Sequence, residues 1–259
     1  MWGAIIGDLA GSVYEFDQIK NIKSINTKEI IPQNAFFSDD TILTVAIAKA
    51  IQTDKNYEKW LRKYGLEYLN YKPKFEPYFK SSFSPGFAKW LNSSEQGRSV
   101  GNGAMMRISP VGIFSISEKE VKKNAMFATL PSHNSKEAIV YSTLVALIIF
   151  YAKNGMSKEE ILKKLDIKLV KREFVKFNTT CNETFDNCIY CAFSSNSFNE
   201  SILKILSLGG DTDTNACITG SIAEALYGVD KELINKARCY IPKEFAKIID
   251  KEYDREILR

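Results

Sequence analysis

The stretch LGGDTDTNA, residues 208–216, packs two carboxylates, three hydroxyl or amide side chains and two glycines into nine positions. The apolar residues after it keep helical spacing up to Gly228, so the stretch stands at the start of a helix. One carboxylate is enough to cap a helix, and two with flanking threonines indicate a further role. An EF-hand calcium loop is excluded, because Ala216 and Ile222 stand where that loop requires glycine and glutamate.

A similar cluster lies far upstream, where Ser38, Asp39 and Asp40 precede an apolar helix predicted over 41–52. At both helix starts the dipole tolerates negative charge, but four carboxylates brought together repel unless a cation lies between them. Carboxylate and hydroxyl oxygens without His or Cys favour Mg²⁺, Mn²⁺ or Ca²⁺ over Zn²⁺. If the two clusters meet in space, the sequence predicts a site for two metal ions. Simple helix capping is the alternative.

The rest of the chain also reads as helical. Helices are predicted at residues 135–155, from Ser157 with Glu160 completing a capping box, at 199–210, at 213–228 and after Pro242. A loop is predicted over 17–37, and no pair of segments has the alternation and turn chemistry of a β-hairpin. We therefore expect a single all-α domain over residues 1–259.

The first predicted helix carries Gly3, Gly7 and Gly11 four residues apart, which leaves one helix face without side chains. We interpret this face as a site of tight helix packing in the core. Asp8 and Glu15 stand seven residues apart and would share the adjoining face of the same helix. One of them is a candidate for a functional role.

Composition and charge exclude several classes of protein. The chain is 45% hydrophobic and 25% charged, and its net charge of +4 does not favour nucleic acid or a membrane surface. The longest apolar run, 144–152, is shorter than the ~20 residues that span a bilayer. The N-terminal segment is expected to be a poor signal peptide, because it has no basic n-region and Asp8 interrupts its apolar run. Aromatic and lysine side chains at 55–90 favour an amphipathic helical region over a stacking surface for nucleic acid.

Five irregularly spaced cysteines predict free thiols in a reducing compartment, so the expected location is cytoplasmic. Three of them, at 181, 188 and 191, would give a zinc site only with further ligands, and no nearby histidine supplies one. The spacing of Cys188 and Cys191 instead predicts one buried helix face.

The Asn102-Gly103 pair is a turn signal that carries only a weak indication of phosphate binding. The single histidine, His133, is by itself more often structural than functional.

Five segments in this order resemble the ADP-ribosylglycohydrolase family, which includes the dinitrogenase-reductase-activating glycohydrolases and the ADP-ribosyl-acceptor hydrolases. They are GAIIGDLAGSVYEF, FSDDTILT, SVGNGAMMRISPVG, LPSHNSKEA and LGGDTDTNACITGSIAEALYG, which together run from residue 3 to about 228. The resemblance implies an all-α fold with a centre of two Mg²⁺ or Mn²⁺ ions. It also implies removal of ADP-ribose from a modified protein side chain or from a small ADP-ribosyl compound.

The resemblance assigns roles to individual residues. It implies metal binding by Ser38, Asp39, Asp40, Asp211, Asp213 and Thr214, and a catalytic role for Glu15. It implies substrate binding by Ser99, Gly101, Asn102, Gly103 and His133, with the first four near the diphosphate and distal ribose. Residues 55–98 match no pattern of the family, so the contacts to the acceptor stay open.

This reading implies that two metals orient the distal ribose through its cis-hydroxyls, and that the bond breaks through an oxocarbenium-like state. Glu15 would be the general acid or the group that activates water, and a metal-bound water is the competing nucleophile. Two other classes stay open: a non-catalytic binding protein on the same fold, and a metal-dependent phosphoesterase. The acceptor is not predicted, and a monomer is expected.

Overall fold

The structure is a computed structural model that describes residues 1–15, 25–72, 81–173 and 176–251. Within these ranges it contains helices, two isolated bridges and no β-strand, so the prediction of an all-α fold is confirmed. The described helices are α1 (Trp2–Gly11), α3 (Asp39–Gln52), α4 (Tyr57–Glu67), α5 (Pro85–Leu91), α6 (Gly103–Met106), α7 (Ser109–Phe114), α8 (Glu118–Thr129), α9 (Lys136–Lys153), α10 (Lys158–Lys164), α11 (Cys181–Phe193), α12 (Phe198–Leu208), α13 (Thr212–Tyr227), α14 (Lys231–Arg238) and α15 (Lys243–Asp250).

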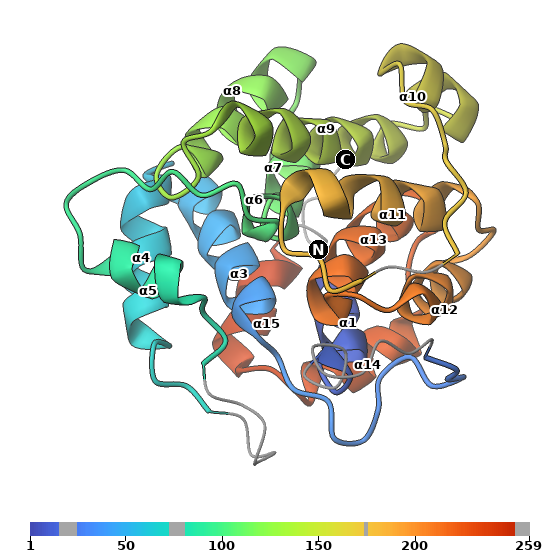
Figure 1. Cartoon of the computed structure of the whole chain (residues 1–259), viewed down its shortest axis with the longest axis horizontal. Coiled ribbons are helices and arrows are strands. Elements are labelled where there is room, and N and C mark those ends of the chain that lie inside the picture. Colours follow the sequence, from blue (N-terminus) through green and yellow to red (C-terminus); the bar gives the residue numbers. More distant parts are fainter. Residues whose placement is uncertain (16–24, 73–80, 174–175, 252–259) are drawn as a thin grey trace.

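The centre of the fold is the packing of α1 against α13 (Figure 1). A Cβ atom added to Gly3, Gly7 or Gly11 would lie closer than 3.0 Å to backbone atoms of Gly220, Ala216 and Thr212, respectively. The contacts step by four residues in opposite directions, which is the register of two antiparallel helices. The predicted packing role of the glycines is thus confirmed, and it brings the loop before α13 to the end of α1.

Most predicted helices are present with small shifts at their ends. Helix α3 begins at Asp39, two residues earlier than predicted, and α9 has Ser135 as its N-cap. The predicted capping box of Ser157 and Glu160 is present at α10. Helices α8 and α14 were not predicted, because both sequences are rich in charged residues.

The predicted loop over 17–37 lies partly outside the described residues, and its described part, 25–37, contains no helix. In the region 55–90 two helices form, α4 and α5, and they bury the aromatic residues Tyr57, Trp60, Tyr64, Phe87 and Trp90. This packing supports the amphipathic interpretation of the segment. The cysteines at 188 and 191 are both buried on α11, as their spacing predicts.

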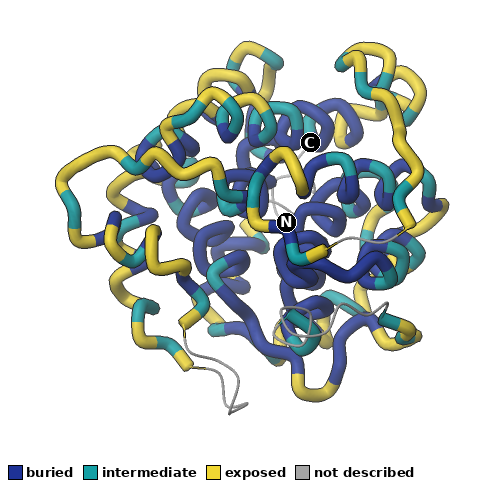
Figure 2. The backbone as a smooth tube through the Cα atoms, in the orientation of Figure 1, coloured by how far each residue is buried: buried dark blue, intermediate teal, exposed yellow. Residues whose placement is uncertain are grey.

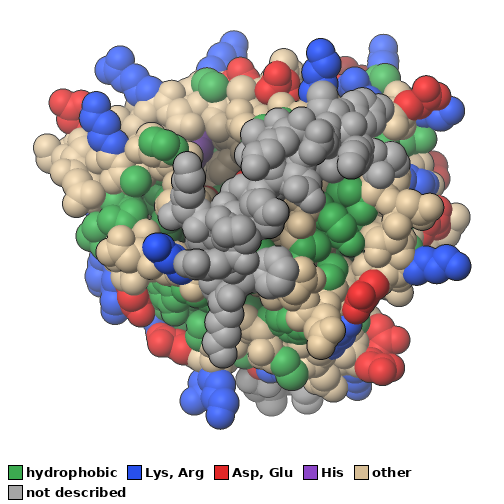
Figure 3. All heavy atoms as spheres, turned by 60° about the horizontal axis from the view of Figure 1, so that its bottom comes forward, with side chains coloured by type: hydrophobic (Ala, Val, Ile, Leu, Met, Phe, Trp, Pro, Cys, Tyr) green, Lys and Arg blue, Asp and Glu red, His purple; other side chains and the backbone are tan. Residues whose placement is uncertain are grey.

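The most buried elements are the ones that carry the acidic clusters (Figure 2). Every residue of α1 is buried, and so are the first twelve residues of α13. None of the described helices is long and apolar enough to cross a bilayer. On the face drawn in Figure 3, the coloured Lys and Arg side chains lie mostly toward the outline and alternate with Asp and Glu, so the described residues form no continuous basic patch there.

Candidate active site

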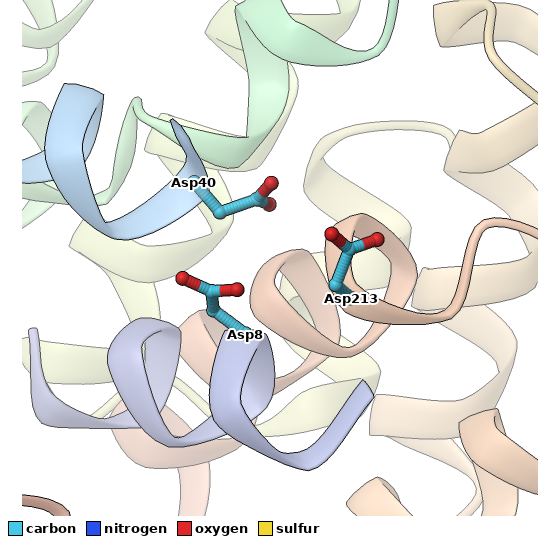
Figure 4. A group of neighbouring side chains, drawn as sticks. All are labelled: Asp8, Asp40 and Asp213. Atoms are coloured by element: carbon cyan, nitrogen blue, oxygen red, sulfur yellow. The ribbon is translucent and has the colours of Figure 1, made fainter. Parts of the chain in front are cut away.

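The two acidic clusters meet at the N-terminal ends of α3 and α13. Thr214 donates a hydrogen bond of 3.2 Å from Oγ1 to Oδ2 of Asp40, which joins one cluster directly to the other. Carboxylate oxygens of Asp8, Asp40 and Asp213 all lie within 4.8 Å of one another (Figure 4). Three helices, α1, α3 and α13, therefore each contribute a carboxylate to one buried point.

Asp8 was not among the predicted site residues, yet it organises the first cluster. It accepts hydrogen bonds from the backbone N–H of Ser38 at 2.9 Å and from that of Thr41 at 3.1 Å. It also accepts from the hydroxyls of Ser38 at 2.8 Å and of Thr41 at 2.5 Å. Since Asp8 sits on the buried helix α1, these four bonds fix the start of α3 against the glycine-packed core.

Helix capping explains only part of the two clusters. Ser38 is the N-cap of α3 and accepts from the backbone N–H of Asp40, as capping requires. Asp211 is the N-cap of α13, but its side chain makes no capping bond. Instead, Oδ2 of Asp211 accepts a hydrogen bond of 2.7 Å from the amide of Asn102. The carboxylate of Asp211 thus serves something other than the capping of its own helix, whereas Asp213 accepts a hydrogen bond from the backbone N–H of Thr214 in α13.

Glu15 forms a second group of acidic side chains with Asp211 and Asp213, again with carboxylate oxygens within 4.8 Å of one another. Helix α1 ends at Gly11, so Glu15 and Asp8 do not share one helix face, and that prediction is wrong. They nevertheless lie on the same cluster, because Asp213 belongs to both groups. Asp39 is half-buried and lines the cleft beside them.

Burial and mutual repulsion raise the pKa of every carboxyl in this cluster. Burial and Asp213 raise the pKa of Asp8 to about 7, although its hydrogen bonds act in the opposite direction. Burial raises the pKa of Asp211 to about 6. Burial and neighbouring carboxylates raise the pKa of four more groups well above their usual range: Glu15, Asp39, Asp40 and Asp213. Without positive charge, this cluster therefore resists ionisation.

The cluster has the properties of a divalent cation site. Oδ1 of Asp40 is buried and accepts no hydrogen bond from the described residues, whereas buried carboxylate oxygens normally have a partner. No described Lys or Arg forms an ion pair with the carboxylates of the cluster. Carboxylate and hydroxyl oxygens are ligands for Mg²⁺ or Mn²⁺. The donor set thus fits the predicted ions, and two acid groups sharing Asp213 fit a pair of them.

A cleft of about 350 Å³ opens over the acidic cluster. The loop at 97–103 forms one of its walls and is held from two sides. Arg98 is bridged to His133, and Gly101 is bridged to Thr180. All the predicted substrate-binding residues line this cleft: Ser99, Gly101, Asn102, Gly103 and His133. The structure therefore places them together with Glu15, Asp39 and the second acidic cluster.

Asn102 has a more specific position than a turn residue needs. Its backbone N–H donates to the carbonyl of Thr179 at 2.8 Å, and its buried amide donates to Asp211. Its side chain thus links the glycine loop to the acidic cluster and orients Asp211. The bond predicts that Asn102 acts on the metal side of the cleft as well as on the substrate side.

A second cavity of about 340 Å³ continues from the cleft and shares Ser84, Phe87, Ser99 and His133 with it. Its far wall includes Trp90, whose buried indole N–H has no partner among the described residues. This cavity could not be predicted, because residues 55–98 match no pattern of the family and their aromatic side chains were interpreted as core. Its aromatic walls extend the cleft away from the acidic cluster.

Comparison with known proteins decides the family. The family model described as ADP-ribosylglycohydrolase matches residues 1–249. The chain belongs to this family. It is 23% identical to ADP-ribosylhydrolase ARH3 of Mus musculus, over 88% of this chain and 83% of that protein. It is 27% identical to ADP-ribosylarginine hydrolase Tri1 of Pseudomonas putida (strain GB-1), over 50% of this chain and 39% of that protein.

A solved structure titled "ADP-ribosylglycohydrolase-related protein complex" has the same fold, with a TM-score of 0.67 and 18% identity. The likeness covers 99% of this chain and 94% of that one. The helical architecture is therefore that of the ADP-ribosylglycohydrolase family along nearly the whole chain. The family resemblance seen in the five sequence segments is confirmed.

Proposed function

We propose that this member of the family is a divalent-metal-dependent hydrolase that cleaves the glycosidic bond between ADP-ribose and a modified acceptor. One observation carries the proposal: two groups of acidic side chains share Asp213 at the floor of a cleft whose wall is a glycine-rich loop. Family membership supports hydrolysis of ADP-ribosyl compounds in general. The name of one relative, ADP-ribosylarginine hydrolase Tri1, supports arginine as an acceptor.

In this proposal the metal ions are held by Ser38, Asp39, Asp40, Asp211, Asp213 and Thr214, which the fold brings to one place. When bound, divalent ions supply Lewis-acid stabilisation and a template for the hydroxyls of the ribose. Asp8 and Asn102 keep the ligands in position through their hydrogen bonds to Ser38 and Asp211. Such supporting bonds to metal ligands typically change metal affinity or activity by about 10- to 100-fold.

Glu15 is the candidate acid or base. It lines the cleft, is only half-buried and lies against the acidic cluster, so it can reach a bound ligand. Breaking the bond through an oxocarbenium-like state requires proton transfer to the leaving group or from the attacking water. Burial and the neighbouring carboxylates raise the pKa of Glu15 in the metal-free chain, and a proton donor needs a raised pKa with the metal bound as well. A donor requires that activity fall as pH rises through this pKa, whereas a base requires the opposite.

The test is turnover of mono-ADP-ribosylated arginine and serine peptides and of small ADP-ribosyl conjugates, with Mg²⁺ or Mn²⁺ and with EDTA. Release of free ADP-ribose that EDTA abolishes and either metal restores is the expected result. Release of AMP would identify a phosphoesterase instead. Binding of ADP-ribose with no turnover of any substrate would identify a non-catalytic protein on this fold.

A further inference from the structure

The hydroxyl of Ser132 connects the single histidine, His133, to the buried Arg107 by hydrogen bonds. Arg107 is fully buried just after α6, and its Nη2 donates to the Ser132 hydroxyl at 2.8 Å and to the Ala128 carbonyl at 3.3 Å. The same Ser132 hydroxyl lies 2.8 Å from Nδ1 of His133. Arg107 Nη2 also lies 3.5 Å from that nitrogen. The three side chains are all buried.

The direction of these bonds follows from the donors available. Arginine has only N–H donors, so the Ser132 oxygen accepts from Arg107. The one hydroxyl proton of Ser132 is then free to point at Nδ1 of His133, which accepts it. If Nδ1 carried the proton, it would face the N–H of Arg107 and the O–H of Ser132, which are both donors. The hydroxyl proton of Ser132 would then have no acceptor among the described residues. Burial and Arg107 also lower the pKa of His133 well below its usual range, which keeps the ring uncharged.

The other ring nitrogen faces the cleft. A Cβ atom built on Gly101 would lie 3.6 Å from Nε2 of His133, and one built on Gly103 would lie 3.5 Å from it. Nε2 makes no hydrogen bond to any described residue, and His133 lines both the cleft and its aromatic extension. Nε2 is therefore placed beside the glycine loop, where a ligand oxygen would lie.

We propose that Arg107 and Ser132 lock His133 in its Nε2-protonated tautomer, which makes the ring a permanent hydrogen-bond donor to an acceptor oxygen of the bound ligand. The inference rests on the proposed function only for the identity of that ligand, an ADP-ribosyl group with diphosphate and ribose oxygens. Arg107 and Ser132 are positioning residues here, because they act through His133. A neutral imidazole donates its N–H to an anionic oxygen at any pH near neutrality, whereas a histidinium would lose its charge as the pH rises.

The tautomer is measured directly in the full-length chain labelled with ¹⁵N-histidine, because one histidine gives one imidazole spectrum. The expected wild-type result is a protonated Nε2 and an unprotonated Nδ1 at neutral pH. In Ser132→Ala the two tautomers should mix. The matched control is Ser195→Ala, which removes a buried hydroxyl with a 2.8 Å bond to Cys191 and should leave the spectrum unchanged. A protonated Nδ1 or mixed tautomers in the wild type would overturn the lock.

Titration with ADP-ribose tests the donor. Saturation should shift the Nε2–H resonance strongly, and Ser132→Ala should weaken affinity by up to about tenfold, the worth of one hydrogen bond. His133→Gln keeps an N–H at the Nε2 position and should bind within about threefold of wild type, whereas His133→Asn should lose about tenfold. An unmoved Nε2 resonance in a saturated sample would overturn the donor role. A locked tautomer in a chain that binds no ADP-ribose would overturn the proposed ligand and leave the lock intact.

Discussion

Gly7 of α1 lies against the carbonyl of Ala216 on α13 with no room for a methyl group between the two helices. The residue after Gly7 is Asp8, and Asp213 lies one turn before Ala216, so this contact sets the distance between the two carboxylates. Close packing of α1 on α13 is thus a condition for the acidic cluster, in addition to its role in the core.

Gly7→Ala should therefore damage both stability and the site. The added Cβ would lie closer than 3.0 Å to three backbone atoms of α13, which cannot move as a flexible side chain does. Overpacking of this kind typically destabilises by about 1–3 kcal/mol, or more where backbone must shift. Thermal unfolding measures the effect, and Gly86→Ala is the matched control, since a Cβ there meets nothing within 4 Å. Equal melting temperatures for the two variants would contradict the packing argument.

Asp8→Asn should lower metal affinity and turnover with a smaller effect on folding. An asparagine has one acceptor oxygen and an NH₂ group, so it cannot accept all four bonds that Ser38 and Thr41 donate. A loss of about 10- to 100-fold is expected, as for other groups that orient metal ligands. Isothermal titration with Mn²⁺ and kcat measure it. Asp54→Asn is the control, because Asp54 also accepts several hydrogen bonds but lies outside the cluster.

Glu15→Gln should reduce kcat by roughly a hundredfold or more, because loss of a general acid or base has this effect. Affinity for ADP-ribose and melting temperature should change little, since Glu15 is half-buried and lines the cleft. A parallel Mg²⁺ titration separates the two roles that its position allows. Weaker metal binding would identify Glu15 as a ligand with Asp211 and Asp213, and unchanged kcat would leave the acid–base role to a metal-bound water.

The metal-free chain should lose stability as pH rises from about 4 to 7. The pKa of Asp8 is raised from 3.8 to about 7 in the folded state, so the folded chain binds more protons than the unfolded chain in this window. The stabilising contribution of Asp8 is thus fully present below pH 3.8 and is lost as the pH rises through about 7, the pKa of Asp8 in the folded state. Asp211, with a pKa of about 6, acts in the same direction. Melting temperature at each pH, with EDTA and then with saturating Mg²⁺, measures the effect.

Metal should reverse this trend, because bound cations favour the ionised carboxylates and bind only the folded cluster. The stabilisation by Mg²⁺ should therefore increase with pH over the same window. A metal-free melting temperature that rises from pH 5 to 7, or a stabilisation by Mg²⁺ that is the same at both pH values, would contradict the acidic cluster as the metal site.

The sequence allowed the two clusters to be predicted because each carries its signal locally. Ser38, Asp39 and Asp40 exceed what a helix start needs, and so do Asp211 and Asp213. Asp8 gave no such signal, since a single aspartate on an apolar helix has no local partner. Its role comes from hydrogen bonds to residues some 30 positions away.

The same limit applies to the histidine. Its position in the cleft could be expected from the resemblance, but its tautomer depends on Arg107, which is 26 residues away in the chain, together with its neighbour Ser132. The aromatic residues at 55–98 could be predicted to be buried, and six of those that the structure describes are buried. Phe87 and Trp90 also line the cavity that shares residues with the cleft. This depends on how α5 packs, which the hydrophobic periodicity of the sequence does not predict.

The contact between α1 and α13 joins two parts of the chain that are far apart in the sequence. Thr212 donates a hydrogen bond to the carbonyl of Gly11, a residue 201 positions earlier in the chain. Every residue of α1 is buried in the folded chain, and its partner α13 begins 201 residues after α1 ends. Long-range contacts form late and leave apolar surface exposed meanwhile. We therefore expect the acidic cluster to assemble late in folding, and a chain that ends before α13 to leave the buried face of α1 exposed to chaperones and proteases.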